Sequence, residues 1–151
     1  MIDVLDKELI FLNQDFSDNE MFFKFIEKEA SALDYLNTGY AEALTEREHN
    51  YPTGLQLDGK GIAIPHADSK YIKKEFIALT TFDNPVHFNS MEDPDDKVDV
   101  NIAFVLGIKD SEKQLETLQK IIEIIQKDEV VDNIMKADDK EDILNALSQK
   151  Q

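Results

Sequence analysis

His66 is the side chain of this 151-residue sequence whose position most suggests chemistry. It ends the segment GIAIPH (61–66), where apolar residues alternate with small ones as in a β-strand until a proline interrupts them. Pro65 fixes its own φ and keeps Ile64 extended. The histidine is therefore predicted at a strand end, where sites in α/β sheets gather. Two interpretations stay open: a neutral imidazole that acts as a nucleophile, or a histidine that only packs there.

A phosphoryl group is one electrophile that such a nucleophile could accept, because the labile N–P bond lets the group be passed on. Its oxygens need hydrogen-bond donors. Arg47 could supply a bidentate guanidinium contact, and a helix predicted to begin at Ser111 could supply backbone N–H groups. Gln114 could add a neutral donor. Simpler roles also fit: Arg47 as a surface residue at a helix end, and Gln114 as the partner of Ser111 in a capping box.

The charge distribution narrows the classes of partner. A net charge of −16 argues against nucleic acid and anionic membrane surfaces, and favours basic protein partners. Residues 60–74 depart from this balance, since they contain four lysines and one aspartate. His66 is therefore predicted to lie in a locally basic segment, unless the fold brings acids to these lysines.

Metal-dependent hydrolysis is the rival chemistry. His49, His66 and His87 are far apart and have no metal-binding spacing. The chain has no cysteine, which fits a reducing cytoplasm, and the acidic loop 89–97 lacks the glycine of a calcium loop. The residues therefore disfavour a metal-dependent hydrolase. His87 lies between two apolar residues and is expected on the opposite strand face, and His49 is expected to decorate a helix.

The predicted elements form an α/β protein, a three-layer α/β/α sandwich around a mixed, parallel and antiparallel, sheet of about five strands. Strands are predicted at 7–12, on both sides of Asp58-Gly59 within 55–64, at 75–82 with 86–88 continuing or following it, and at 98–108. Helices are predicted at 18–36, at 40–49, from Ser111 onward, around 130–135 and around 143–147. The length suits one domain. The longest apolar run, 102–108, is too short to cross a bilayer, and the N-terminus shows no signal peptide.

Capping patterns set the predicted helix starts. Ser17 with Glu20 forms a capping box before an amphipathic stripe of phenylalanines, which is predicted to lie in the core. Asp138 with Glu141 has the same spacing before the last helix.

Several segments, in order, resemble the IIA component of the phosphoenolpyruvate-dependent sugar phosphotransferase system, fructose/mannitol class. They are ALTERE (43–48), PTGLQLDGKGIAIPH (52–66), FIAL (76–79), VDVNIAFVLGI (98–108) and DDKEDILNAL (138–147). The resemblance covers nearly the whole chain, which implies a single type-2 IIA domain over residues 1–151.

The resemblance implies a cytoplasmic phosphocarrier. His66 matches the family histidine that accepts a phosphoryl group from the phosphocarrier protein HPr and passes it to a cysteine of a IIB component. The sugar is then phosphorylated during uptake through the membrane component IIC. Arg47 matches the arginine that supports the phosphoryl group. The family needs no metal or organic cofactor, and a IIA domain does not itself enter the membrane.

Two positions depart from the usual fructose and mannitol pattern. Gln114 stands where those members usually have a second histidine, and Ala67 follows His66 where they usually have glycine. A glutamine there, the PTG form and the VHF segment resemble the galactitol branch. Gln114 can hydrogen-bond a phosphoryl oxygen but cannot titrate, so no proton chemistry is expected from it.

Two functional hypotheses follow from this resemblance. The first is a phosphotransferase component of sugar uptake. The alternative is a IIA-like regulatory module that acts by phosphorylation-dependent binding of another protein. Transfer to a IIB component separates the two.

Overall fold

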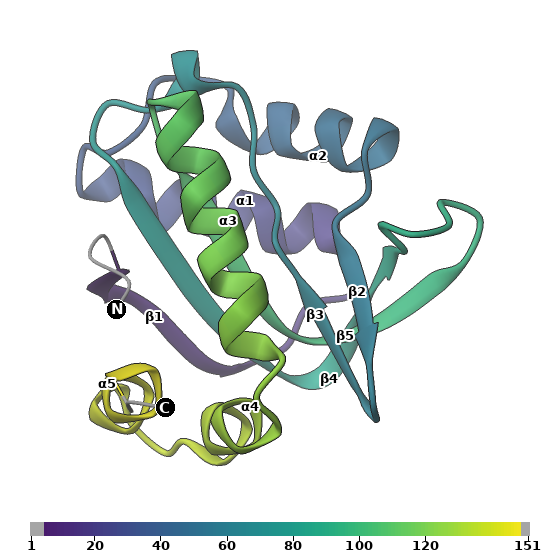
Figure 1. The fold of residues 1–151 in the computed structure, drawn as a ribbon. Helices are drawn as coiled ribbons and strands as arrows, with labels where there is room; N and C mark the ends of the chain where they lie inside the picture. The colour runs from purple at the N-terminus through teal and green to yellow at the C-terminus, as the bar shows by residue number, and fades with distance from the viewer. Residues whose placement is uncertain (1–4, 149–151) are drawn as a thin grey trace.

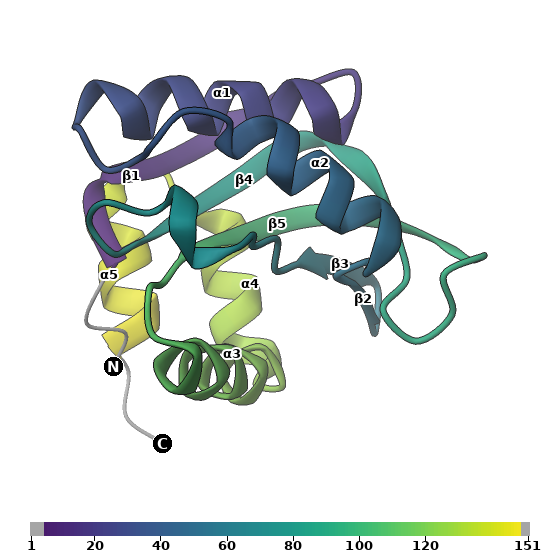
Figure 2. The ribbon, with the colours of Figure 1, turned by 90° about the horizontal axis from the view of Figure 1, so that it is seen from above.

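The computed structural model describes residues 5–148 and consists of a five-stranded sheet between two layers of helices (Figures 1 and 2). The strands are β1 (Leu5–Gln14), β2 (Gly54–Leu57), β3 (Lys60–Ala63), β4 (Phe76–Asn89) and β5 (Lys97–Gly107). The helices are α1 (Asn19–Ala32), α2 (Tyr40–Asn50), the short 3-10 helix η1 (Ser69–Tyr71), α3 (Ser111–Ile125), α4 (Asp128–Lys136) and α5 (Lys140–Ser148). In Figure 2, α1 and α2 cover one face of the sheet, and α3, α4 and α5 cover the other.

The sheet is mixed, as predicted. Its strand order is β1-β4-β5-β3-β2. The pairs β1–β4 and β3–β5 are parallel, and β4–β5 and β2–β3 are antiparallel. The predicted segments 75–82 and 86–88 belong to one strand, β4, whose register shifts between Thr81 and Val86. The predicted hairpin is confirmed: Gly59 takes a φ of +73° in the turn between β2 and β3, which glycine adopts at little cost.

Each face of the sheet has its own core. The predicted phenylalanine stripe packs under α1, where Phe22, Phe23 and Ile26 are fully buried. Each such side chain contributes about 2 kcal/mol by leaving water. Isoleucines and leucines fill the opposite face, against α3, α4 and α5. The α/β/α arrangement predicted from the sequence is therefore confirmed over residues 5–148, and residues 1–4 and 149–151 of the predicted domain lie outside the described part.

The predicted helix caps are wrong by one residue. Asp18, not Ser17, accepts a backbone N–H of α1 at 2.9 Å, and Asp110, not Ser111, accepts one of α3 at 3.0 Å. An aspartate caps as well as a serine, and its negative charge also interacts with the positive end of the helix dipole. The helix predicted over 18–36 ends at Ala32, before the chain turns with a positive φ at Asp34.

The capping box of the last helix is shifted in the same way. Asp139 accepts the N–H of Asp142 at 2.9 Å, and the Asp142 carboxylate accepts the N–H of Asp138 at 3.0 Å. The predicted partner Glu141 instead forms an exposed ion pair with Lys7. Within residues 5–148, no helix is both long and apolar enough to cross a bilayer.

Candidate functional site

His66 lies three residues beyond the end of β3, beside the C-terminal end of β5. It pairs with Leu106 as an isolated parallel bridge, and the Pro65 carbonyl accepts the Leu106 N–H at 2.9 Å. Strands β3 and β5 approach very closely at Gly61, where a Cβ would lie 2.0 Å from the Asp99 carbonyl oxygen. Glycine at that position therefore lets the segment that carries His66 lie against the centre of the sheet.

The hydrogen bonding of His66 assigns its tautomer. The ring Nδ1 lies 3.0 Å from the Ile64 carbonyl oxygen. Because a carbonyl can only accept, Nδ1 carries the proton and Nε2 carries the free lone pair. Burial lowers the pKa of His66, the bond to Ile64 opposes this shift, and the positive charge of Arg47 lowers the pKa further. The imidazole is therefore neutral near pH 7, as a nucleophile requires.

Arg47 projects from the last turn of α2 and interacts electrostatically with His66. Its guanidinium carbon lies 4.9 Å from the centre of the Tyr51 ring. Within residues 5–148, no carboxylate lies within 4.0 Å of its nitrogens, so its donors can receive an anion. A cavity of about 250 Å³ adjoins it, lined by Ala43, Glu46, Arg47, Asn50, Tyr51, Asp68, Lys70 and Tyr71.

The locally basic segment is partly neutralised by the fold. Lys60 pairs with Asp132 at 2.6 Å, and Lys73 pairs with Asp34 at 2.8 Å. Lys70 instead borders the cavity beside Arg47. The excess of lysines over residues 60–74 thus overstates the positive charge near His66.

Gln114 lies in the first turn of α3, which follows the strand that carries Leu106. Its Oε1 is buried and has no hydrogen-bond partner among the described residues. The hydrogen bonds of residues 5–148 do not join it to His66. The charge of Arg47 thus acts on the pKa of His66, and the roles of Arg47 and Gln114 toward a phosphoryl group stay predictions.

The predicted anion site at the start of α3 is partly filled by carboxylates of the chain itself. Asp110 takes the N–H of Glu112 at 3.0 Å, and Glu75 takes the N–H of Lys109 at 2.9 Å. Glu75 also pairs with Lys113, which holds the pKa of Glu75 below its usual value. These N–H groups are therefore not assigned to a phosphoryl group.

Sequence reasoning gave no role to Glu48 and Thr53. Both are buried, and the Thr53 N–H and hydroxyl donate to the Glu48 carboxylate at 2.6 and 2.9 Å. Their signal lies in the helical period, because Glu48 follows the buried Tyr40 and Leu44 at intervals of four residues on α2. That spacing places a carboxylate on the buried face of the helix.

The other two histidines lie away from this arrangement. His49 is exposed in the last turn of α2, and His87 is exposed on β4 between buried neighbours, as predicted. The His87 Nδ1 lies 2.7 Å from a carboxylate oxygen of Asp99. Among residues 5–148, no three histidine or carboxylate side chains gather in a way that could hold a metal ion.

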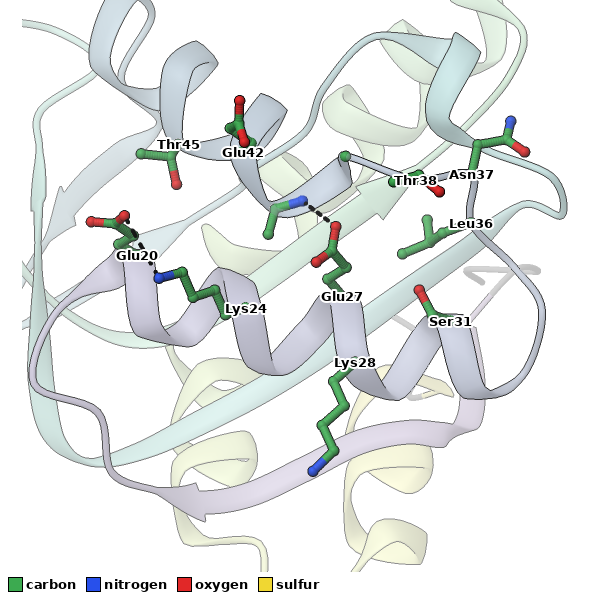
Figure 3. Close-up of a pocket in the computed structure, with 12 residues that line it drawn as sticks. Glu20, Lys24, Glu27, Lys28, Ser31, Leu36, Asn37, Thr38, Glu42 and Thr45 are labelled. Atoms are coloured by element: carbon green, nitrogen blue, oxygen red, sulfur yellow. Dashed lines mark hydrogen bonds and ion pairs between the residues drawn. The ribbon is translucent and has the colours of Figure 1, made fainter.

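A larger cavity, of about 800 Å³, lies between α1, α2 and the segment that joins them (Figure 3). Its lining includes neither His66 nor Arg47. Figure 3 shows Glu27 of α1, whose carboxylate accepts the Ala41 N–H at 3.0 Å. Glu27 thereby caps α2, whose N-cap residue Gly39 has no side chain to do so. This second region therefore anchors the helix that carries Arg47.

Known proteins that are similar to this chain include a sugar phosphotransferase component and a transcriptional regulator. The chain is 29% identical over 120 residues to the galactitol-specific EIIA component of Escherichia coli, which covers 80% of this chain and 79% of that one. It is 33% identical over 110 residues to the transcriptional regulator ManR of Bacillus subtilis, covering 71% of this chain and 15% of that protein.

A solved structure has the same fold. The mannitol enzyme IIA of Escherichia coli, determined in complex with phosphorylated enzyme IIB, superposes with a TM-score of 0.73 at 18% identity, over 97% of this chain and 98% of that one. The family model for the phosphoenolpyruvate-dependent sugar phosphotransferase system, EIIA 2, matches residues 3–150. The chain therefore belongs to this EIIA family.

Proposed function

We propose that this protein is the phosphocarrier IIA component of a sugar phosphotransferase system, with His66 as the phosphoryl acceptor. One observation carries the proposal: a neutral imidazole with a free Nε2 lies within the electrostatic influence of Arg47. Within residues 5–148, the guanidinium of Arg47 forms no ion pair with a carboxylate. An unpaired guanidinium beside a neutral nucleophile suits a group that carries negative charge.

The step is a transfer between two nitrogens. The Nε2 lone pair of His66 attacks phosphorus, the Nε2–P bond forms, and the N–P bond to the histidine of phospho-HPr breaks, returning its electron pair to that nitrogen. Arg47 neutralises charge on the equatorial oxygens. Gln114 adds a side-chain N–H donor. In the second transfer, a cysteine thiolate of a IIB component attacks phosphorus, an S–P bond forms and the Nε2–P bond breaks.

The partners follow from this role. HPr is the donor and a IIB component is the acceptor, and the membrane component IIC is served indirectly. The galactitol-specific relative and the glutamine at position 114 support galactitol as the sugar. The protein acts in the cytoplasm, where these partners meet, and needs neither metal nor organic cofactor.

The first test is intact-mass analysis after mixing with phosphoenolpyruvate, enzyme I and HPr. We expect one acid-labile phosphoryl group on the wild type and none on His66→Ala, because the variant lacks the imidazole that accepts the group. His87→Ala is the matched control and should be phosphorylated like the wild type. An unmodified wild-type protein beside charged HPr would contradict the proposal.

A regulatory role is the second candidate, and the similarity to part of ManR favours it. In that case His66 is still phosphorylated, but the group does not move on to any IIB component. Mixing phosphorylated protein with candidate IIB components separates the roles: loss of the group to a cysteine supports transport, and phosphorylation-dependent binding without transfer supports regulation.

A further inference from the structure

Glu48 is a buried carboxylate that the transfer step does not use. The residue is 5% exposed, and Thr53 donates to its carboxylate twice, from its N–H at 2.6 Å and from its hydroxyl at 2.9 Å. Burial raises the pKa of Glu48 to about 7, although the bonds from Thr53 and the charge of Arg47 oppose this shift. Burying a carboxylate costs free energy unless the group is well paired, so the groups to which Glu48 is connected matter.

Thr53 connects Glu48 to the segment that carries His66. Its hydroxyl oxygen accepts the Ile64 N–H at 3.3 Å, while the hydroxyl proton goes to Glu48. Ile64 lies one residue beyond β3, and its carbonyl accepts the His66 Nδ1–H at 3.0 Å. The two backbone groups of Ile64 therefore join the Glu48–Thr53 pair to the imidazole.

The other side of the segment is held from the same helix. The Pro65 carbonyl accepts the Leu106 N–H at 2.9 Å, and the Leu106 carbonyl accepts the Tyr40 hydroxyl at 3.1 Å. Tyr40 and Glu48 both lie on the buried face of α2, and Arg47 lies on its exposed face. The hydrogen bonds on both sides of the His66 segment thus connect it to α2, the helix that carries Arg47.

We propose that Glu48 and Thr53 are positioning residues, which hold Ile64 so that its carbonyl keeps His66 in the Nδ1–H tautomer with Nε2 free. Without the Thr53 hydroxyl, the buried Ile64 N–H loses its partner, which is unfavourable unless the segment shifts. A small shift of a nucleophile slows a transfer step strongly. The kinetic part of this inference rests on the proposed function, and the tautomeric part does not.

A purely structural role makes a different prediction. In that case the Glu48–Thr53 pair only closes the turn between α2 and β2. Its loss would lower the melting temperature, and the tautomer of His66 would stay unchanged.

The test compares Thr53→Val, which removes the hydroxyl, with Thr53→Ser, which keeps it. The ¹⁵N chemical shifts of the imidazole nitrogens report the tautomer, with His87 as an internal reference in the same spectra. Single-turnover phosphorylation by phospho-HPr over a range of concentrations separates the maximal rate constant from the half-saturating concentration. Melting curves establish that each variant is folded.

We expect Thr53→Val to reduce the Nδ1–H fraction of His66 and to lower the maximal rate constant about tenfold, the equivalent of one hydrogen bond. The half-saturating concentration should not change, and Thr53→Ser should retain both properties. If Thr53→Val does not fold, Glu48→Gln provides the comparison, because its amide has one acceptor oxygen in place of the two that Thr53 contacts. An unchanged tautomer in a folded variant overturns the inference. Failure of the proposed function would look different, since the wild type itself would not be phosphorylated.

Discussion

His66 and His87 both follow a proline closely and both lie beside β5, His66 opposite Leu106 and His87 opposite Asp99. Their surroundings differ. His66 is partly buried, and its Nδ1 is bonded to a backbone carbonyl. The His87 side chain is 68% exposed, and its Nδ1 faces a carboxylate.

This difference shows what makes a histidine a candidate nucleophile here. A carbonyl fixes one tautomer without adding charge, so Nε2 keeps its lone pair and the ring stays neutral. At His87 the partner of Nδ1 is an exposed carboxylate, so solvent reaches both the ring and its partner. Substitutions around each histidine test this difference.

The largest expected effect concerns the stability of the network behind His66. Burial raises the pKa of Glu48 from 4.5 to about 7. Between these values the folded protein holds a proton that the unfolded chain has released, so stability falls as pH rises through this window. The loss is about 3 kcal/mol, because each pH unit between the two pKa values contributes about 1.4 kcal/mol. Urea unfolding at pH 5 and pH 8 should show this fall in the wild type and not in Glu48→Gln.

The region of His87 supplies the control for that measurement. Asp99 is exposed, so Asp99→Asn should keep the pH dependence of the wild type. If the free energy of unfolding changed with pH in the same way for the wild type and Glu48→Gln, the pKa of Glu48 would not be raised by burial. The regions of His66 and His87 would then not differ in this respect.

Arg47→Ala should slow phosphoryl acceptance by roughly 100-fold, the usual effect of removing one donor that stabilises transition-state charge. The measurement is single-turnover phosphorylation by phospho-HPr. Arg47→Lys should lie between this variant and the wild type, because an ammonium keeps the charge and loses the bidentate geometry. Lys97→Ala is the matched control: this exposed lysine lies on β5 near the partner of His87. Equal losses for both cations would mean that only net charge matters.

The pH dependence of acceptance is the next effect in size. Because burial and Arg47 lower the pKa of His66, the rate constant should be flat near neutral pH and fall about tenfold per unit only below that pKa. In Arg47→Ala one of the two causes is absent, so the acid limb should move to higher pH. NMR titration of the imidazole follows the same group independently of activity. A limb that does not move would place Arg47 too far away to act on His66.

Local patterns predicted much of this site, and long-range contacts account for the rest. The alternation before Pro65 and the Asp58-Gly59 turn depend on neighbouring residues, so the strand end and the hairpin could be predicted. The predicted caps of α1 and α3 are wrong by one residue because an aspartate and a serine, which are both good N-cap residues, stand next to each other. The ion pairs of Lys60 and Lys73 join residues far apart in sequence, which no local charge count includes.

The smallest expected effect is that of the pair at His87. Asp99→Asn removes an ion pair whose two side chains are 68% and 64% exposed, and such pairs contribute about 0–1 kcal/mol. Phosphorylation of His66 should be unchanged, because the His66 segment pairs with Leu106 at the other end of β5. Chemical unfolding and the intact-mass assay check the two parts. A large loss of phosphorylation would show that the two ends of β5 are coupled, and the two histidines could then no longer be treated as independent sites.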